Sequence, residues 1–177
     1  MTKKFEFEIE GITEILPHKF HGLEEEKKLK TETEEIQAEK HAYFNSNGNL
    51  AIPSVWIKGA LINEFYDSAP QKERTRTQKQ VSPRLMIVPA MLDLGTKKYD
   101  VDVRSVPAGG RHGGCRDFCV RPIIKLPWKV KGTLITTLDI SDKDLRRKFE
   151  NAGMNQGIGS NRINGYGRFK IVVFNNL

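Results

Sequence analysis

The alternation at the start of the chain is the feature that most limits its fold. Phe5, Phe7 and Ile9 alternate with charged side chains, and this period of two is typical of a β-strand that buries one face. The segment 168–174 is apolar enough to be a buried strand that closes the sequence. We therefore expect both segments to lie in a sheet.

Two helices are expected between these strands. Ser54 begins a segment with apolar residues at every fourth position, which predicts a helix over 54–66. Ser141 begins a second segment that is expected to be helical as far as Gly153. Further strands are expected at 84–92, 98–106, 115–125 and 128–138. This order predicts an α+β fold of the ferredoxin-like (βαββαβ) class, with an antiparallel sheet and two helices on one face.

The remaining segments are expected to be insertions into a single domain of residues 1–177. Residues 23–48 form a polar, charged insertion, of which 23–40 is either a solvated helix or disordered. Residues 68–82 are polar and mostly basic, which suits a mobile loop. Residues 93–125 are expected to form an inserted basic β-hairpin with a glycine-rich tip.

Charge is distributed unevenly along the chain, which has a net charge of +7. Residues 1–67 carry 8 basic and 13 acidic side chains, whereas residues 68–177 carry 21 basic and 9 acidic ones, a balance of +12. Such a field attracts a polyanion, so nucleic acid is the first ligand class to consider, with a solubilising surface charge as the alternative.

Membrane association is not expected, because no run of about 18 apolar residues occurs and the first residues lack the apolar stretch of a signal peptide. We expect a cytoplasmic protein without a cofactor.

A glycine-rich loop is expected between the second helix and the final strand. Its glycines are Gly157, Gly159, Gly165 and Gly167. Their missing side chains would let backbone N–H groups approach a phosphate, while Arg162 and Arg168 supply positive charge. Tyr166 is a candidate for stacking on a base. A plain tight turn is the alternative interpretation.

Two motifs resemble those of a known superfamily. The Gly-Tyr-Gly-Arg-Phe segment 165–169, which enters the last strand, resembles the C-terminal glycine-rich loop of the RAMP (repeat-associated mysterious protein) superfamily of CRISPR-associated proteins. The segment 52–61, with an Ile-Pro, a Ser and a Lys-Gly, is similar to the helix signature of that superfamily's crRNA-binding backbone subunits. The resemblance implies a ferredoxin-like palm that holds single-stranded RNA, and a hairpin thumb that reaches a neighbouring subunit.

The resemblance also implies particular contacts. Ser54 and Lys58 match the helix signature and would face the RNA backbone, as would the four loop glycines and Arg168. The candidates on the thumb rest on position and charge, and they are Arg104, Arg111, Arg116 and Arg121.

The histidines and cysteines suggest two alternatives. His18 and His21 follow the first strand, near where a related crRNA-processing branch keeps a general acid/base histidine, so a metal-independent endoribonuclease is possible. His112, Cys115 and Cys119 form an H-x2-C-x3-C run, but zinc sites normally show two spaced pairs, so we expect reduced cysteines without a metal.

The sequence thus predicts a protein that binds single-stranded nucleic acid without catalysis, RNA before DNA. Its further partners would be copies of itself or other CRISPR-type subunits. No Asp occupies the segment 16–23, where backbone subunits that cut target RNA carry an acidic residue, which argues against target cleavage and suggests a diverged or phage-borne member. A phage-encoded inhibitor that mimics a backbone subunit is a third interpretation.

Overall fold

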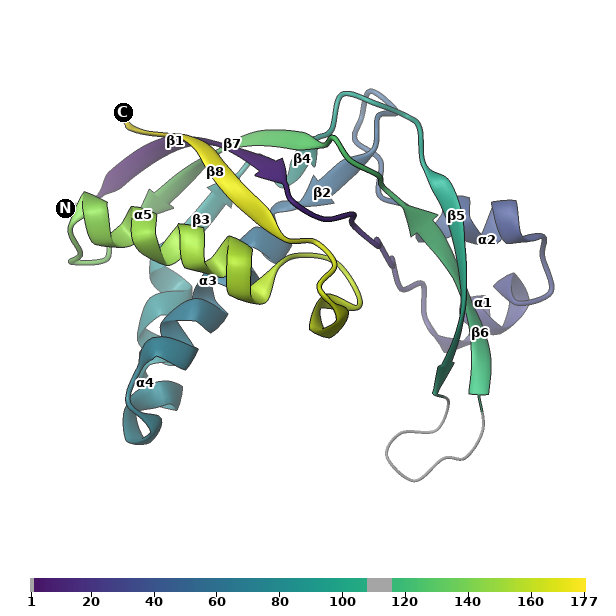
Figure 1. The fold of residues 1–177 in the computed structure, drawn as a ribbon, viewed down its shortest axis with the longest axis horizontal. Coiled ribbons are helices and arrows are strands. Elements are labelled where there is room, and N and C mark those ends of the chain that lie inside the picture. The colour runs from purple at the N-terminus through teal and green to yellow at the C-terminus, as the bar shows by residue number, and fades with distance from the viewer. Residues whose placement is uncertain (1, 108–115) are drawn as a thin grey trace.

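The computed structural model describes residues 2–107 and 116–177 (Figure 1). The predicted hairpin tip, with Arg111, His112 and Cys115, lies outside the described residues. Within the described ranges, no helix has the length and apolar character that a membrane span requires.

A four-stranded antiparallel sheet forms the centre of the main lobe. Its strands, in spatial order β3-β7-β1-β8, are β3 (Leu85–Val88), β7 (Lys129–Thr136), β1 (Lys3–Gly11) and β8 (Phe169–Asn176). The alternation read in β1 places Phe5, Phe7 and Ile9 in the core, where each is at most 1% exposed. Gly132 of β7 lies opposite Phe7, and a Cβ at this glycine would be 2.7 Å from the Phe7 ring, so this position has no room for a side chain.

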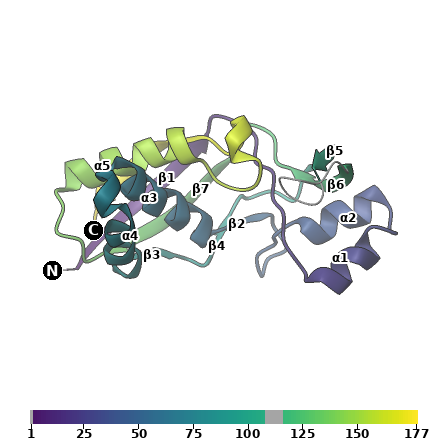
Figure 2. The same cartoon turned by 90° about the horizontal axis from the view of Figure 1, so that it is seen from below.

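Two helices cover one face of this sheet: α3 (Ser54–Ser68) and α5 (Asp142–Asn151) (Figures 1 and 2). The Ser141 side chain caps α5 by accepting a hydrogen bond from the Asp144 N–H at 3.1 Å. Phe149 of α5 packs edge-on against Phe7, with 5.2 Å between ring centroids. The predicted α+β class with an antiparallel sheet is confirmed, and the strand order with its two crossover helices matches a β-α-β-β-α-β chain.

A second lobe lies beyond the end of β1 (Figure 1). It consists of the hairpin β5 (Asp100–Pro107) and β6 (Arg116–Ile123), packed beside α1 (Leu23–Leu29) and α2 (Glu34–His41). The disordered alternative for 23–40 is wrong, because Leu29, Ala38 and His41 are buried within this lobe. Between the lobes, β2 (Ala51–Pro53) pairs with β4 (Met91–Asp93).

The segment 68–82, expected to be a mobile loop, instead forms a helix. A short 3-10 turn at Gln71–Glu73 leads into α4 (Arg74–Val81), which projects from α3 on the side away from the sheet (Figure 1). The Arg74 guanidinium lies 5.5 Å from the centre of the Tyr66 ring and donates to backbone carbonyls at the end of α3, while Val81 is buried. These contacts order a segment whose polar composition favours a loop.

The second helix does not stop at Gly153 as expected. After α5 the chain continues as a π-helical turn, Ala152–Gln156. A Cβ at Gly153 would lie 2.2 Å from the carbonyl oxygen of Phe169. A glycine is therefore needed at position 153 because this turn packs closely against β8. Gly153 does not end the helix.

Candidate nucleic-acid interface

Backbone hydrogen bonds join the glycine-rich loop to the chain segment that follows β1. The Ser160 N–H donates to the Leu16 carbonyl at 2.8 Å, and the Gly167 N–H donates to the Glu14 carbonyl at 2.7 Å. The Ile158 N–H donates across the loop to the Gly167 carbonyl at 3.0 Å. These three amides already have protein partners and are therefore not free to bind a phosphate.

The glycines mainly allow this close packing. Gly167 has a φ of +71°, and a Cβ there would lie 1.8 Å from the Ile158 carbonyl oxygen. Gly157 and Gly159 also have positive φ, and a Cβ at either would be crowded by backbone atoms at 2.9 to 3.1 Å. Gly165 differs, because nothing lies within 4 Å of its Cβ position. Three of the four glycines are thus accounted for by the fold of the loop itself.

A groove of about 620 Å³ opens on the outer side of this loop. Its lining contains two guanidinium groups together with amides and a hydroxyl, and no carboxylate among the described residues. The lining residues are Asn63, Asn155, Gln156, Gly159, Ser160, Asn161, Arg162, Ile163 and Arg168. Helix α3, the π-helical turn and the loop therefore meet around a polar, positively charged hollow.

Arg168 is the fixed cation of this groove. Its backbone N–H donates to the Thr13 hydroxyl at 2.8 Å, and that hydroxyl donates to the Gly165 carbonyl at 2.8 Å. Its Nη2 donates to the Arg162 carbonyl at 3.1 Å. Its Nη1 is buried and has no hydrogen-bond partner within the part of the chain that the structure describes. Arg162 itself is exposed, so the two arginines offer one held and one free guanidinium to an anion.

The predicted helix residues lie nearby but outside this lining. Ser54 is 6% exposed, and its backbone N–H donates to the Ala90 carbonyl, whereas Lys58 is half-buried. The amino end of α3 and the loop both lie at the end of the sheet that faces the hairpin (Figures 1 and 2). Asn63, further along α3, is the residue of this helix that reaches the groove.

The three predicted thumb arginines that the structure describes, Arg104, Arg116 and Arg121, occupy different environments. Arg116 is exposed, and its Nε donates to the Ser105 hydroxyl at 2.8 Å. Arg104 reaches out of the hairpin to Tyr166 of the loop and covers its ring, with 4.6 Å between the guanidinium carbon and the ring centre. Tyr166 therefore already stacks on a protein cation, which leaves less of its ring for a base.

Arg121 requires a correction. Its side chain is 7% exposed, and its Nε lies 3.5 Å from the Asp102 carboxylate, which pairs with Arg104 as well. A buried guanidinium that neutralises a buried carboxylate is part of the hairpin interior, so Arg121 does not belong to the charged surface.

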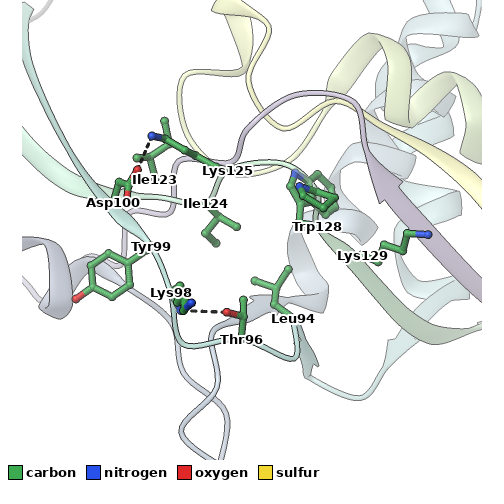
Figure 3. Close-up of a pocket in the computed structure, with 11 residues that line it drawn as sticks. Leu94, Thr96, Lys98, Tyr99, Asp100, Ile123, Ile124, Lys125, Trp128 and Lys129 are labelled. Carbon is green, nitrogen blue, oxygen red and sulfur yellow. Dashed lines mark hydrogen bonds and ion pairs between the residues drawn. The ribbon is translucent and has the colours of Figure 1, made fainter.

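A second cavity, of about 490 Å³, lies between the base of the hairpin and the sheet (Figure 3). It contains Trp128, which is 3% exposed and donates its indole N–H to the Thr13 carbonyl at 2.8 Å. Lys125 and Asp100 form an ion pair at its rim (Figure 3). None of the residues predicted to bind nucleic acid on the helix 54–66, the hairpin or the glycine-rich loop lines this cavity.

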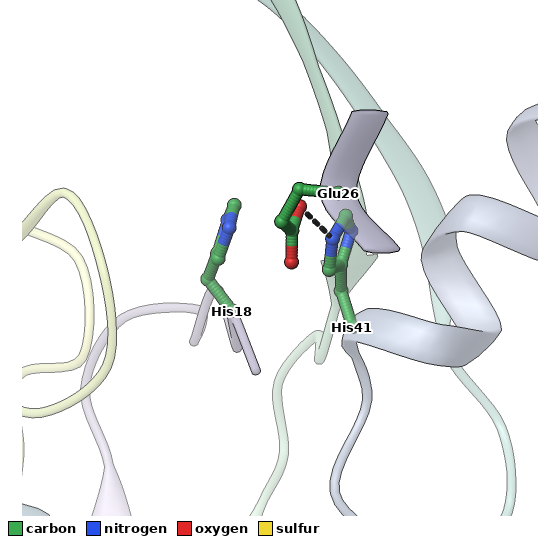
Figure 4. A group of neighbouring side chains, drawn as sticks. All are labelled: His18, Glu26 and His41. Carbon is green, nitrogen blue, oxygen red and sulfur yellow. Dashed lines mark hydrogen bonds and ion pairs between the residues drawn. The ribbon is translucent and has the colours of Figure 1, made fainter. Parts of the chain in front are cut away.

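The three histidines that the structure describes, His18, His21 and His41, gather in the second lobe. The rings of His18 and His41 are stacked, with 4.5 Å between centroids, and His41 Nε2 is 3.1 Å from a Glu26 carboxylate oxygen (Figure 4). Burial and the neighbouring His41 lower the pKa of His18. His21 places its Nε2 2.7 Å from the Lys40 carbonyl. Cys119, the member of the H-x2-C-x3-C run that the structure describes, lies beside His18.

Sequence reasoning missed several of these groups. The amides of Asn155 and Gln156 directly precede the glycine-rich segment, and a run of amides beside two arginines is a readable signal for polar recognition. Asn63 carries no such signal, because it reaches the groove only through the packing of α3. Glu26 and His41 are likewise brought to His18 by the fold alone.

Comparison with known proteins adds little at the level of sequence. No protein-family model matches the chain. A stretch of 93 residues, 52% of this chain, is 29% identical to the glycerol kinase of Oceanobacillus iheyensis, and it spans 18% of that kinase. A match over so small a share of the enzyme assigns neither its family nor its activity.

Comparison of structures is more informative. The fold is similar to that of a chain in the cryo-EM structure of the type III-B Cmr-beta bound to cognate target RNA, with a TM-score of 0.63 and 13% identity. The match covers 99% of this chain and 61% of that chain. The chain has a RAMP-like fold. The crystal structure of Cmr6 from Pyrococcus furiosus matches over 96% of this chain and 97% of its own, at 12% identity, but its TM-score of 0.42 is too low to add to the argument.

The RAMP-like fold is the fold that the resemblance of segments 52–61 and 165–169 implies. This chain spans less than two thirds of the Cmr-beta chain, and identity at this level concerns the fold only. The evidence for a function of this chain therefore lies in its own residues, in the groove beside the glycine-rich loop.

Proposed function

We propose that this RAMP-like protein binds single-stranded RNA in the groove between α3 and the glycine-rich loop, without catalysis, as a backbone-type subunit. The observation that carries the proposal is the pair of arginines in the groove lining: the Arg168 guanidinium is held by its hydrogen bond to the Arg162 carbonyl, and the Arg162 side chain is exposed. Two guanidinium groups in one groove can donate charge-assisted hydrogen bonds to a phosphate.

The rest of the groove fits the same ligand. Among the described residues, the lining has no carboxylate to repel a phosphate chain. Asn and Gln side chains donate and accept hydrogen bonds, as contacts to sugar hydroxyls and base edges require. The 2′-hydroxyl makes RNA the preferred ligand over DNA. The similar chain comes from the structure of Cmr-beta bound to cognate target RNA, which supports this choice of ligand class.

Binding to this groove is testable by charge reversal. The variant R162E/R168E should lose affinity for a single-stranded RNA of about 30 nucleotides, and its salt dependence should weaken by a slope of about 1.4, since each phosphate contact on a single strand contributes about 0.7. The matched control is R146E/R147E, the same change of charge on the exposed side of α5, where both arginines pair with carboxylates of their own helix. Fluorescence anisotropy at two salt concentrations measures both effects.

The outcome separates local binding from a general charge effect. Equal losses in the two double variants would contradict a specific groove, and no loss in R162E/R168E would end the proposal. A single-stranded DNA of the same sequence, used as competitor, tests the preference for RNA. Weaker competition by DNA is expected, because it lacks the 2′-hydroxyl.

Association with copies of itself or other CRISPR-type subunits has support from the hairpin. Val101, Val103 and Phe118 lie on one face of it, since alternate residues share a face and Phe118 is opposite Ser105. All three are exposed, Phe118 by 71%. An exposed apolar strip on a projecting hairpin suits contact with a neighbouring subunit.

Size-exclusion chromatography with the same RNA tests this second part. Several protein copies per RNA are expected at saturation, and Phe118→Asp should reduce that number while leaving the affinity of the first copy unchanged. A 1:1 complex of the unmodified protein would refute self-association along the strand. The ribonuclease with His18 or His21 and the inhibitor that mimics a subunit stay untested predictions, and neither histidine lines the groove.

A further inference from the structure

Three titratable side chains from separate segments share one partly buried site in the second lobe. His18 lies in the chain after β1, Glu26 in α1 and His41 at the end of α2. The two imidazole rings are stacked nearly parallel, with 4.5 Å between centroids and 20° between planes (Figure 4). One ring or carboxylate atom of each residue lies within 4.8 Å of the other two. A proton gained by one of these groups therefore acts directly on the others.

The hydrogen bonds of His41 require a proton on both of its ring nitrogens. Nδ1 is 2.7 Å from the Val120 carbonyl oxygen, and Nε2 is 3.1 Å from a Glu26 carboxylate oxygen. A carbonyl and an ionised carboxylate only accept hydrogen bonds, so each nitrogen must donate. Burial raises the pKa of Glu26, but hydrogen bonds from the His21 N–H and from His41 outweigh burial and hold that pKa below its usual value. The pair is thus an imidazolium beside a carboxylate, with no net charge.

His18 is the neutral member of the stack. Burial, followed by the charge of His41, lowers the pKa of His18. Its Nδ1 lies 3.6 Å from the Cys119 sulfur, a weak partner that needs no charge on the ring. One carboxylate neutralises one imidazolium, so a second proton, on His18, would leave two like charges stacked beside Glu26 alone.

The other charged groups around the stack do not balance a second proton. After burial and His41, the neighbouring Arg121 and His21 lower the pKa of His18 further. Among the described residues that act on this pKa, Glu26 alone raises it. The remaining charges on the surrounding elements pair with one another. These pairs are Arg121 with Asp102 and Lys30 with Asp117.

We propose that the stacked pair of His18 and His41 is a pH-sensitive contact that holds β6 against α1 and α2 near neutral pH and opens in mild acid. Both rings contact β6, one at the Cys119 sulfur and the other at the Val120 carbonyl. Helix α2, which ends at His41, packs on the same strand. Protonation of His18 would therefore weaken the packing of the segment 18–41 on the hairpin. This inference does not depend on RNA binding in the groove.

The direction of the pH effect follows from the lowered pKa of His18. In an opened or unfolded segment the imidazole titrates near about 6.5, whereas in the closed structure it gains its proton at lower pH. The open form therefore binds more protons, and the closed form loses stability as the pH falls from about 6.5 to the folded pKa. Between pH 7.5 and pH 5.5 the equilibrium constant for opening should rise by up to about tenfold.

Hydrogen exchange of the full chain, without RNA, measures this opening segment by segment. After correction for the intrinsic effect of pH on exchange, amides of α1, α2 and β6 should exchange faster at pH 5.5 than at pH 7.5. His18→Gln keeps a hydrogen-bonding side chain but has no proton to gain, so it should remove this acid response. His21→Gln is the matched control and should retain the response, because Nε2 of His21 faces the Lys40 carbonyl outside the stack.

Ring-nitrogen NMR of the wild type tests the protonation states directly. At pH 6.5, His41 should give the shifts of an imidazolium and His18 those of a neutral ring, and His18 should titrate at lower pH together with the rise in exchange. This titration decides the matter even if His18→Gln does not fold, since exchange that rises without protonation of His18 contradicts the proposal.

Three further results would overturn the proposal. The first is a neutral His41 at pH 6.5. The second is an acid response in His18→Gln as large as in the wild type, or its loss in His21→Gln. The third is equal exchange at pH 5.5 in the second lobe and in β1 and β7, which would indicate global unfolding instead of a local opening.

Discussion

The Arg104 guanidinium of β5 lies over the ring of Tyr166 in the glycine-rich loop, 4.6 Å from its centre. Its Nη2 also donates a hydrogen bond to the Tyr166 hydroxyl, and its Nε donates to Asp102. These two residues are 62 positions apart in the sequence, and their contact connects the hairpin with the loop beside the groove. The orientation of the hairpin is therefore linked to the surface where we propose that RNA binds.

The first prediction measures this link by a double-mutant cycle. Arg104→Ala and Tyr166→Ala should each lower the free energy of unfolding, and the two changes should be coupled by about 0.5 to 1 kcal/mol, as for a cation–π pair near the surface. Urea denaturation of the four proteins gives the coupling. Arg116→Ala, on the same hairpin but bonded to Ser105, should show no coupling to Tyr166→Ala. Additive effects for Arg104 would mean that the contact does not hold the two parts together.

The second prediction compares two loop glycines. Gly165→Ala should cost about 1 to 2 kcal/mol, because its φ of +87° is unfavourable for a side chain but the space around it is open. Gly167→Ala should cost more than about 3 kcal/mol, because overpacking against the Ile158 carbonyl adds to the same strain. Thermal unfolding of the two variants provides the comparison. Equal costs would show that the loop can move away from the crowded position.

The third prediction concerns the seam between α5 and the sheet. Phe149 is fully buried and packs against the rings of Phe7 and Phe169. Phe149→Ala should lower the free energy of unfolding by about 3 to 5 kcal/mol, as other large-to-small core changes do. Ile163→Ala should change it by less than about 0.5 kcal/mol, since Ile163 is 93% exposed. A small change in the free energy of unfolding for Phe149→Ala would contradict the packing of α5 against the core.

The fourth prediction is a pH dependence at the start of α5. Hydrogen bonds from Lys3 and then Asn176 lower the pKa of Asp142. Because the folded pKa lies below the unfolded value of about 3.9, the stabilisation is complete above that value and is lost as the pH falls through the folded pKa. Asp142→Asn should thus be less stable than the wild type at pH 7, and the difference should shrink as the pH falls below the unfolded value of about 3.9.

Denaturation midpoints across this pH range test the Asp142 effect. Asp139→Asn is the matched control, since it changes an exposed carboxylate that no ion pair among the described residues includes. A difference between wild type and Asp142→Asn that stays constant with pH would contradict the assignment.

Local patterns were enough to place most of the regular elements. The helix expected over 54–66 runs from Ser54 to Ser68, and the alternation of Phe5, Phe7 and Ile9 identified the strand at the centre of the sheet. The polar segment 68–82 forms a helix where its composition predicts a loop, because α4 is ordered by contacts of Arg74 and Val81 rather than by a pattern of its own.

The candidate sites were only partly readable. Arg162 and Arg168 line the groove as their place in the glycine-rich loop suggests, but Arg121 turns inward to Asp102. The sequence of a segment gives the number of its charged side chains. It does not give the face of the hairpin on which each side chain lies. The pairing of Asp102 with Arg121 follows from the hairpin register, which is set by the whole β5–β6 ladder.

The sequence by itself determined the class of fold, the positions of the main strands and helices and the basic character of residues 68–177, because period and composition are local properties. The tertiary structure decided that α3 contributes Asn63 to the groove, that Arg104 meets Tyr166, and that Cys119 lies beside His18, 101 residues earlier in the chain. Contacts between such distant residues arise from the packing of whole elements, and no local spacing encodes them.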